Sequence, residues 1–270
     1  MGQRFFLYSR VAYILGFSVL ISGCSDPCED VSCANGGFCV DGNCSCAEGW
    51  TGDDCTEPIE TVATGCGDVS AITFDGHSYD LVQIGSQCWF AENLRSDNYR
   101  NGDAIPGNLS DAQWTSTSSG AQTVYGEGTS TVYNGSSDEV ANLATYGRLY
   151  NWYAVNDSRG LCPSGFHVPS DVEWTELEDA LGGSEVAGTA LKAASPAWDG
   201  TNFSGFSALP GGARYSDAGS FLDQGYYGSW WSSSPNGTYA WSRNLYSGYS
   251  VVIRYYYDTR GGFSVRCVRD

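Results

Sequence analysis

Basic side chains are scarce in this chain of 270 residues, which has one lysine, Lys192, and twelve arginines against 31 acidic residues. The formal net charge is −18, and the sequence contains no cluster of basic residues. Nucleic acids and anionic membrane surfaces are both bound through Lys and Arg side chains. The composition therefore argues against a nucleic-acid partner and against electrostatic adhesion to a membrane, and the acidic surface favours solubility.

Long apolar runs are lacking as well. The run "VAYILGFSVLIS", residues 11–22, has about the length of a signal-peptide core and is too short to span a bilayer comfortably. It follows Arg4 and Arg10, as a signal-peptide core follows its basic start. We therefore interpret residues 1–23 as a targeting signal and exclude them from the fold.

The end of this signal carries a second pattern. Ile21-Ser22-Gly23-Cys24, in which two small residues precede a cysteine, resembles the bacterial lipobox. The resemblance implies cleavage before Cys24, lipid on the Cys24 thiol and a lipid-anchored N-terminus at residues 24–27. The expected location is the bacterial outer membrane, with exposure at the cell surface left open. A cleaved signal peptide with an unmodified Cys24 is the alternative.

Motifs of catalysis and metal binding are also missing from the sequence. The two histidines, His77 and His167, lie in different segments and in no metal-ligand spacing. The nucleophile elbow, the P-loop and the dinucleotide fingerprint are all absent. We predict no catalytic residue, no cofactor and no metal ligand, although the many carboxylates leave a structural calcium ion open.

Cysteine, in contrast, is abundant, with eleven residues in all. Six of them lie in "CEDVSCANGGFCVDGNCSCAEGWTGDDC", residues 28–55, a piece too short to build an apolar core and therefore dependent on disulfides. Spacing alone leaves fifteen pairings open. The segment resembles an EGF-like module, and the resemblance implies the pairs Cys28–Cys39, Cys33–Cys44 and Cys46–Cys55. The calcium-binding pattern of such modules is broken here.

Residues 56–65 are interpreted as a linker, and residues 66–270 as one main domain rich in aromatic and turn residues. The start of this domain alternates like two short strands around an Asp75-Gly76 turn. Residues 97–138 are polar and predicted to be irregular. A capping box at Ser170 and Glu173 predicts a helix in "PSDVEWTELEDALGG". A stripe of apolar residues predicts a second helix in "YGRLYNWYAV".

Successive motifs of this domain are similar to those of the Fibrobacter succinogenes major paralogous domain, a family of exported bacterial proteins with a poorly defined role. The motifs run in order over almost all of residues 66–270 and include "DGHSYDLVQIGSQCWFAENLR", "GLCPSGFHVPSDVEWTELE", "WWSSS" and "GFSVRCVRD". Their order also resembles the C-type-lectin-like fold. The expected class is therefore α+β, with two helices and antiparallel strands. The second resemblance implies the disulfide Cys162–Cys267, which leaves Cys66 for Cys88.

Two activities linked to that fold are not carried over. Formylglycine-generating enzymes use a pair of reactive cysteines near the C-terminus, where this chain offers only Cys267. Sugar-binding C-type lectins hold calcium with Glu-Pro-Asn or Gln-Pro-Asp and Trp-Asn-Asp, and this chain has none of these tripeptides. An enzyme of the sulfatase-modifying or polysaccharide-acting type stays as an alternative, as does a purely structural envelope protein.

The aromatic residues of the C-terminal region are the remaining indication of function. Flat aromatic faces among polar neighbours suit stacking on sugar rings or packing against a protein. We expect Tyr226, Tyr227 and Tyr256 to be exposed and to bind a ligand. We expect Trp230, Trp231 and Trp241 to lie in the core. The predicted function is a non-catalytic, membrane-anchored binding or adhesion protein for a glycan or a surface protein.

Overall fold

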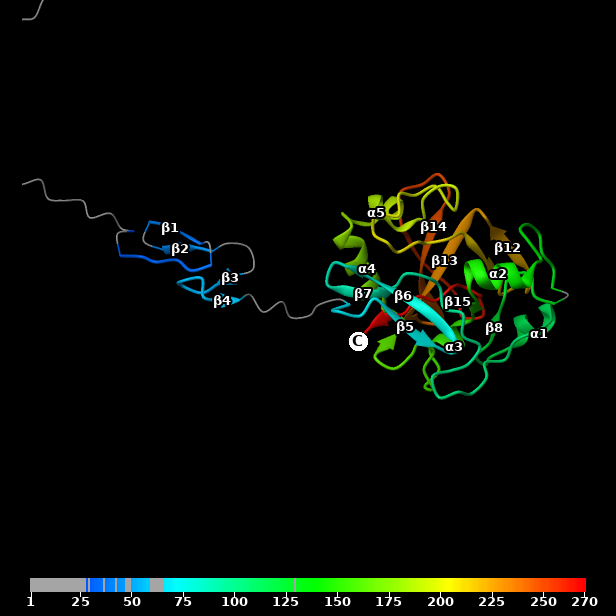
Figure 1. Cartoon of the computed structure of the whole chain (residues 1–270). Coiled ribbons are helices and arrows are strands. Elements are labelled where there is room, and N and C mark those ends of the chain that lie inside the picture. The colour runs from blue at the N-terminus through cyan, green and yellow to red at the C-terminus, as the bar shows by residue number, and fades with distance from the viewer. Residues whose placement is uncertain are drawn as a thin grey trace, which may run out of the picture. The chain divides into compact units, whose positions relative to one another are not determined.

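The computed structural model describes residues 28, 30–35, 37–41, 43–46, 50–58, 66–128 and 130–270. The chain divides into two compact units, residues 1–61 and 62–270 (Figure 1). The predicted targeting signal, the predicted anchor at Cys24 and residues 59–65 of the predicted linker lie outside the described residues.

The first unit is a small disulfide-linked set of hairpins. Strand β1 (Phe38–Val40) pairs with β2 (Asn43–Ser45), and β3 (Trp50–Thr51) pairs with β4 (Glu57–Pro58), both antiparallel. Its disulfides are Cys28–Cys39, Cys33–Cys44 and Cys46–Cys55, which are the expected pairs. Cys55 is fully buried. The bridges thus supply the interior that so short a segment cannot build from apolar side chains.

The second unit is a mixed α+β structure that contains two five-stranded sheets. The first sheet has the order β10-β16-β7-β6-β5. Its strands are β5 (Ala71–Phe74), β6 (His77–Ile84), β7 (Gln87–Phe90), β10 (Phe166–His167) and β16 (Val268–Arg269). Strands β5 and β6 form the hairpin predicted around Asp75-Gly76, and both turn residues have positive φ. The C-terminus is tied into this sheet, because β16 lies between β7 and β10.

The second sheet has the order β12-β11-β13-β14-β15. Its strands are β11 (Gly211–Arg214), β12 (Phe221–Gln224), β13 (Tyr227–Asn236), β14 (Tyr239–Tyr246) and β15 (Ile253–Asp258). All its pairs are antiparallel except the pair of β11 with β13. The long hairpin of β13 and β14 brings most aromatic residues of the C-terminal region onto one sheet.

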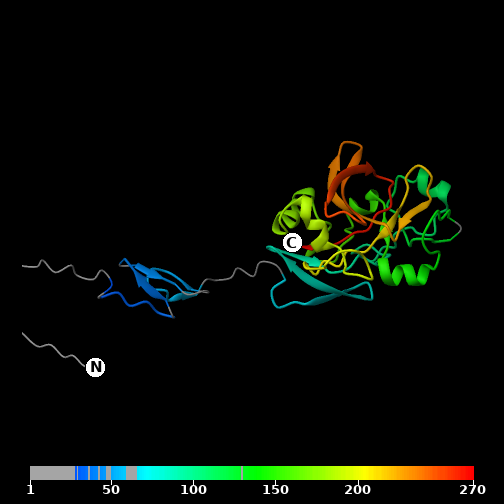
Figure 2. The same ribbon diagram turned by 90° about the horizontal axis from the view of Figure 1, so that it is seen from above.

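Five helices lie around the two sheets within the described residues: α1 (Asp111–Ser116), α2 (Glu139–Tyr146), α3 (Trp152–Val155), α4 (Asp171–Ala180) and α5 (Ser184–Leu191). Helices α4 and α5 lie on one side of the second unit, and α1 and α2 lie on the opposite side (Figures 1 and 2). None of the described helices has the length and apolar character needed to cross a bilayer.

Helix α4 confirms the capping-box prediction. The Ser170 side chain accepts a hydrogen bond from the Glu173 amide, and the Glu173 carboxylate accepts one from the Ser170 amide. Trp174 and Leu177 are buried as predicted. Leu181, which was expected on the same buried stripe, is the C-cap and is only half-buried.

The second predicted helix is wrong. Helix α2 ends at Tyr146, Leu149 and Tyr150 form β9, which pairs with β8 (Gln122–Thr123), and α3 follows as a single turn. The break comes at Gly147, whose φ is +74° and where a Cβ would lie 2.8 Å from the Leu94 carbonyl oxygen. Contact with the Leu94 backbone therefore ends the helix at a glycine with positive φ, which the local periodicity of apolar residues does not reveal.

Residues 97–138, predicted to be irregular, are mostly so but also contain α1 and β8. Trp114 of α1 is fully buried, and the Arg214 guanidinium lies 4.5 Å from its ring centroid. Arg214 is itself fully buried and donates to the Leu109 and Gly219 carbonyls. This excursion is thus held to the second sheet by a buried cation.

Candidate functional site

One face of the second sheet gathers tyrosine side chains. In the register of β13 with β14, Tyr227 lies opposite Tyr246, and their ring centroids are 4.8 Å apart. In the register of β14 with β15, Asn244 lies opposite Ile253 and Ser242 opposite Tyr255. Residues directly opposite each other in an antiparallel pair point to the same face. Alternation along β14 and β15 then places Tyr246, Ile253, Tyr255 and Tyr257 on one face, together with Tyr227.

This face contains an open groove of about 320 Å³ lined by Tyr226, Tyr246, Tyr249 and Ile253. We call it the tyrosine groove. Tyr226 is 53% exposed and Tyr249 is 60% exposed, so both rings are available to a ligand. The volume lies within the range of small-molecule sites in proteins. Exposed rings of this kind offer flat apolar surface beside polar hydroxyl groups.

The turn that carries Tyr249 is held by the only lysine of the chain. Lys192, which is 2% exposed, donates from Nζ to the carbonyls of Tyr246 (3.2 Å) and Tyr249 (2.8 Å). Its ammonium also lies 2.6 Å from Asp199 Oδ1. Asp199 in turn accepts a hydrogen bond from the Gly248 amide. Burial acts to raise the pKa of Asp199, but the bonds from Lys192 and Gly248 outweigh it and lower that pKa.

Further hydrogen bonds fix the same turn to Tyr226. Trp198 Nε1 donates to Ser247 Oγ at 2.8 Å, and Ser247 Oγ donates to the Tyr226 carbonyl at 3.0 Å. The Ser247 amide donates to the same carbonyl at 2.9 Å. The two most exposed rings of the tyrosine groove are thus attached to one hydrogen-bonded frame. A groove that is ordered before a ligand arrives loses less conformational entropy on binding.

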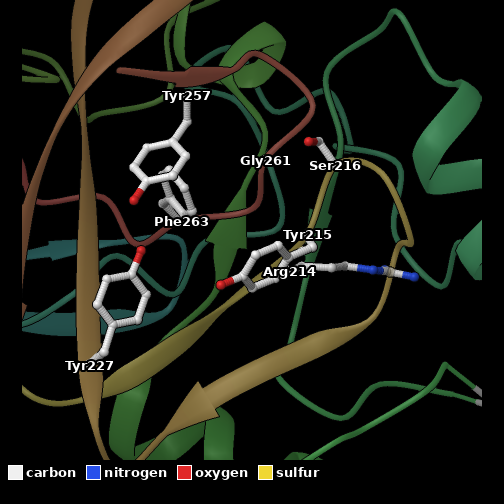
Figure 3. Close-up of a pocket in the computed structure, with 7 residues that line it drawn as sticks. All are labelled: Arg214, Tyr215, Ser216, Tyr227, Tyr257, Gly261 and Phe263. Atoms are coloured by element: carbon white, nitrogen blue, oxygen red, sulfur yellow. The ribbon is translucent and has the colours of Figure 1, made fainter. Parts of the chain in front are cut away.

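Near the tyrosine groove lies a small, partly open cavity of about 30 Å³, which has room for one water molecule. Figure 3 shows that the hydroxyl groups of Tyr215, Tyr227 and Tyr257 point toward its centre. The other lining residues are Arg214, Ser216, Gly261 and Phe263. Burial raises the pKa of Tyr215 to about 12 and that of Tyr227 well above its usual value. The Tyr215 and Tyr227 phenols therefore remain protonated at neutral pH.

The opposite face of the same sheet carries a second aromatic row, whose Tyr256 ring stacks on the Tyr255 ring with centroids 5.0 Å apart. The Arg254 guanidinium lies 3.3 Å from the Trp241 ring centroid, and Trp241 contacts Tyr256 edge-on at 5.7 Å. Tyr239 packs against Tyr256 at 5.4 Å. Arg254 also pairs with Asp171 of α4 through Nη2 at 2.8 Å. This row is thus anchored to α4 by an ion pair.

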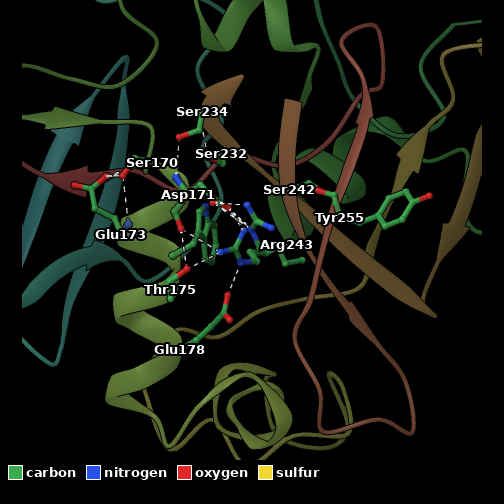
Figure 4. Close-up of polar contacts among 12 residues, drawn as sticks. Ser170, Asp171, Glu173, Thr175, Glu178, Ser232, Ser234, Ser242, Arg243 and Tyr255 are labelled. Atoms are coloured by element: carbon green, nitrogen blue, oxygen red, sulfur yellow. Dashed lines mark hydrogen bonds and ion pairs between the residues drawn. The ribbon is translucent and has the colours of Figure 1, made fainter. Parts of the chain in front are cut away.

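Arg243 of β14 connects the sheet to α4 in the interior (Figure 4). Its side chain is 1% exposed, donates from Nη1 to Asp171 Oδ1 at 2.7 Å, and is ion-paired through Nε with Glu178. Thr175 accepts a further bond from Nη2 at 3.1 Å. Burial raises the pKa of Glu178 despite the neighbouring guanidinium. Asp171 bridges Arg243 and Arg254, so α4 supports both β14 and β15.

The structure separates the three tyrosines that were expected to bind together. Tyr226 lies in the tyrosine groove, whereas Tyr256, 40% exposed, lies on the opposite face with Trp241. The expectation that Tyr227 is exposed is wrong, since it is 4% exposed and its hydroxyl accepts a bond from Ser229. Its position at the start of a central strand, opposite Tyr246, buries it.

The expectations for the tryptophans are right for two residues and wrong for one. Trp230 and Trp231 are fully buried, whereas Trp241 is half-buried beneath Arg254. Sequence reasoning missed Tyr246, Tyr249 and the role of Lys192. No local pattern in the sequence marks Lys192 for burial, because lysine is rarely buried and its partner Asp199 meets it only through the tertiary fold.

The cysteines of the second unit form Cys66–Cys88 and Cys162–Cys267, which are the expected pairs. Cys267 is fully buried. The predicted anchor Cys24 lies outside the described residues. His167 lies 2.7 Å from both Glu173 and Asp270. Within the part of the chain that the structure describes, no group of three or more His, Cys, Asp or Glu side chains is arranged to hold a metal ion.

Comparison with known proteins gives a family for the second unit. The family model of the Fibrobacter succinogenes major domain matches residues 82–269, from β6 to β16. The match includes all residues of the tyrosine groove and the Lys192 frame. No curated protein and no solved structure matches the chain. Because the family model spans more than half of the sequence, the chain belongs to the Fibrobacter succinogenes major domain family.

Proposed function

We propose that this protein is a non-catalytic binding protein of the bacterial outer membrane and that the tyrosine groove binds a neutral glycan. The observation that carries the proposal is a groove of about 320 Å³ with two rings more than half exposed on a frame fixed by buried Lys192. Open aromatic surface on a rigid frame suits a sugar ring, which stacks its apolar face and keeps its hydroxyl groups in water.

The charge around the groove favours a neutral ligand over an acidic one. Lys192 is buried and ion-paired with Asp199, so its charge is not offered to a ligand. Asp223 lies next to the neighbouring cavity, where it accepts a bond from the Tyr215 hydroxyl at 3.2 Å. The net charge of −18 repels uronic and other acidic sugars. A neutral saccharide is free of this repulsion.

The first unit and the N-terminus complete the proposal. We infer an EGF-like module at residues 28–55 that separates the binding domain from a lipid on Cys24, and a C-type-lectin-like fold for the main domain. The disulfide pattern supports the module. Mass spectrometry of the mature protein tests the anchor: a diacyl or triacyl group on Cys24 is expected, and a free Cys24 thiol contradicts it.

The alternative of thiol-based catalysis receives no support from Cys267, which lies fully buried in the disulfide with Cys162. Labelling the native protein with a thiol reagent separates the two ideas. No label on Cys267 is expected for a binding protein. A labelled Cys267 would favour an enzyme of the sulfatase-modifying type.

An oligosaccharide array probed with purified full-length protein tests glycan binding. Neutral oligosaccharides should bind, and acidic ones should not. Tyr249→Ala removes an exposed ring of the groove and should weaken binding by about tenfold, the loss expected for about 1.4 kcal/mol. Tyr133→Ala is the matched control, because Tyr133 is 66% exposed and outside the groove. Equal binding by both variants, or no neutral ligand on the array, would contradict the proposal.

A further inference from the structure

Strand β15 is an edge of the second sheet. It pairs with β14 alone. The opposite edge differs, because Val132 forms a parallel bridge with Phe221 of β12 and the Tyr133 amide donates to the Phe221 carbonyl at 3.1 Å. Proteins usually block an exposed edge with lysine, proline, a bulge or a covering loop. Strand β15 contains neither lysine nor proline, and its charged residues are Arg254 and Asp258.

The outward side of this edge presents free backbone groups. The Ile253 carbonyl accepts a bond from Asn244 Nδ2 and the Tyr255 carbonyl one from Ser242 Oγ, and both donor side chains belong to β14. These two carbonyls therefore face β14. Because backbone groups alternate along a strand, the amides and carbonyls of Arg254 and Tyr256 face away from the sheet. No hydrogen bond within the described residues reaches them.

The side chains along the same stretch are exposed on both faces. The exposed fractions are 37% for Ile253, 48% for Tyr255 and 40% for Tyr256. The Arg254 side chain is 44% exposed. Aromatic and β-branched residues favour strand pairing, and aromatic residues are enriched at protein interfaces. The edge thus combines unpaired backbone with side chains suited to a strand partner.

We propose that β15 pairs antiparallel with β15 of a second copy of this chain, with Tyr256 on the two-fold axis. In this register Arg254 of one copy lies directly opposite Asp258 of the other, and the contact occurs twice. Opposite charges facing each other across an antiparallel pair are stabilising. A register centred on Arg254 would instead place two guanidinium groups together. The strand is therefore self-complementary in charge, and its backbone groups are free at Arg254 and Tyr256. The Asp258 carbonyl already accepts a bond from the Gly261 amide at 2.9 Å.

The side chains leave room for these contacts. Arg254 uses Nε and Nη2 to bind Asp171, and no described residue bonds its Nη1. Asp258 accepts from Arg260 and remains partly exposed. The two-fold axis is perpendicular to the sheet, so the dimer presents both tyrosine grooves on the same side. If the proposed function holds, one polysaccharide chain can occupy both grooves, which increases its overall affinity.

Cysteine cross-linking tests the register. Tyr256→Cys in the full chain places two thiols at a hydrogen-bonded pair, where Cα atoms lie about 5.5 Å apart and a disulfide can form. Mild oxidation should give a dimer on a non-reducing gel. Tyr239→Cys, at a 44% exposed position on interior strand β14, should remain monomeric. The unchanged chain, run in parallel, accounts for any link through Cys24. Equal cross-linking of both variants, or none in Tyr256→Cys, would overturn the register.

Light scattering of the full chain in detergent tests the assembly itself. The unchanged protein should have the mass of two copies at micromolar concentration. Tyr256→Lys places two ammonium groups at the two-fold axis and should give monomers. Tyr133→Lys, beside the opposite edge of the sheet, should leave the dimer intact. A monomeric unchanged protein that still binds glycan would overturn the dimer and leave the proposed function standing. Unchanged dimerisation in Tyr256→Lys would also overturn the edge contact.

Discussion

At the scale of single residues, Lys192 is a buried side chain that holds the backbone of the tyrosine groove in place. Its ammonium joins two backbone carbonyls of the tyrosine groove to Asp199. Since the lysine is 2% exposed, its contribution is to geometry and not to the charge felt by a ligand. Such a residue fixes the shape of the groove without being part of its lining.

Replacing this lysine tests that role. Lys192→Met should lower the free energy of unfolding by about 2–3 kcal/mol, because two carbonyls and Asp199 lose their partner. The value lies below that of a fully buried pair because Asp199 is 38% exposed and can be hydrated. Urea unfolding measures the loss, and glycan binding should fall with it. Val172→Ala, at a 65% exposed position on α4, serves as the control. A loss under about 0.5 kcal/mol would contradict the role.

His167 gives the protein a stability that depends on pH. Its hydrogen bond to Glu173 raises the His167 pKa above 6.5, despite partial burial, and Asp270 adds to the effect. Burial acts to raise the Glu173 pKa, but the bonds from His167 and Ser170 outweigh it and lower that pKa to about 2. The His167 contribution is complete below pH 6.5 and is lost as the pH rises through its folded pKa. The Glu173 contribution is complete above pH 4.5 and is lost toward pH 2.

Stability should therefore be greatest between about pH 4.5 and 6.5, as far as this pair decides it. His167→Gln should remove the decline in unfolding free energy between pH 6.5 and 8. It should also shrink the acidic limb, because the Ser170 bonds alone then lower the Glu173 pKa. Chemical unfolding across this pH range provides the measurement. A variant with the same decline as the unchanged protein would assign the pH dependence to other groups.

At the scale of elements, α4 is the support for the whole C-terminal hairpin. Its first turn holds the capping box, and Asp171 of the same turn pairs with Arg243 and Arg254 on two different strands. The start of this helix is therefore set by local sequence, whereas its position against the sheet is set by ion pairs from residues about 70 to 80 positions later.

Ser170→Ala should lower the free energy of unfolding by about 1 kcal/mol, because the Glu173 amide loses its acceptor at the helix start. Thermal unfolding followed by circular dichroism measures the change. Val172→Ala, next to the cap and exposed, should change stability by less than about 0.5 kcal/mol. Similar effects of the two substitutions would mean that the cap contributes nothing specific.

At the scale of the whole molecule, one disulfide closes a loop over about half of the second unit. Cys162–Cys267 spans 105 residues, whereas Cys66–Cys88 spans 22. In the chain-entropy account, a disulfide stabilises the folded protein by restricting the unfolded chain, and a longer closed loop gives a larger stabilisation. Replacing both Cys162 and Cys267 with alanine should cost about 4–5 kcal/mol, and replacing both Cys66 and Cys88 about 3 kcal/mol. Denaturant unfolding of the two double variants compares them. The reverse order would point to native-state packing as the larger effect.

Sequence alone determined the features that arise from neighbouring residues. The capping box of α4 and the β5–β6 hairpin follow from hydrogen bonds and turn conformations within a few positions. The disulfide pairs followed only through family resemblance, since spacing left them open. Local patterns are readable because their partners lie close along the chain.

Tertiary structure decided the rest. The apolar stripe that predicted a helix is interrupted at Gly147. The cause is the Leu94 backbone, which lies against this glycine. Tyr227 is buried and Trp241 is half-buried because strand order and register decide on which face of the sheet each side chain lies and which neighbours pack over it. The tyrosine groove joins Tyr226 to residues 246–253, and its frame adds residues 192 and 199, which no local pattern connects. Burial and long-range pairing depend on which strands meet, and the backbone fixes that only when the whole chain is folded.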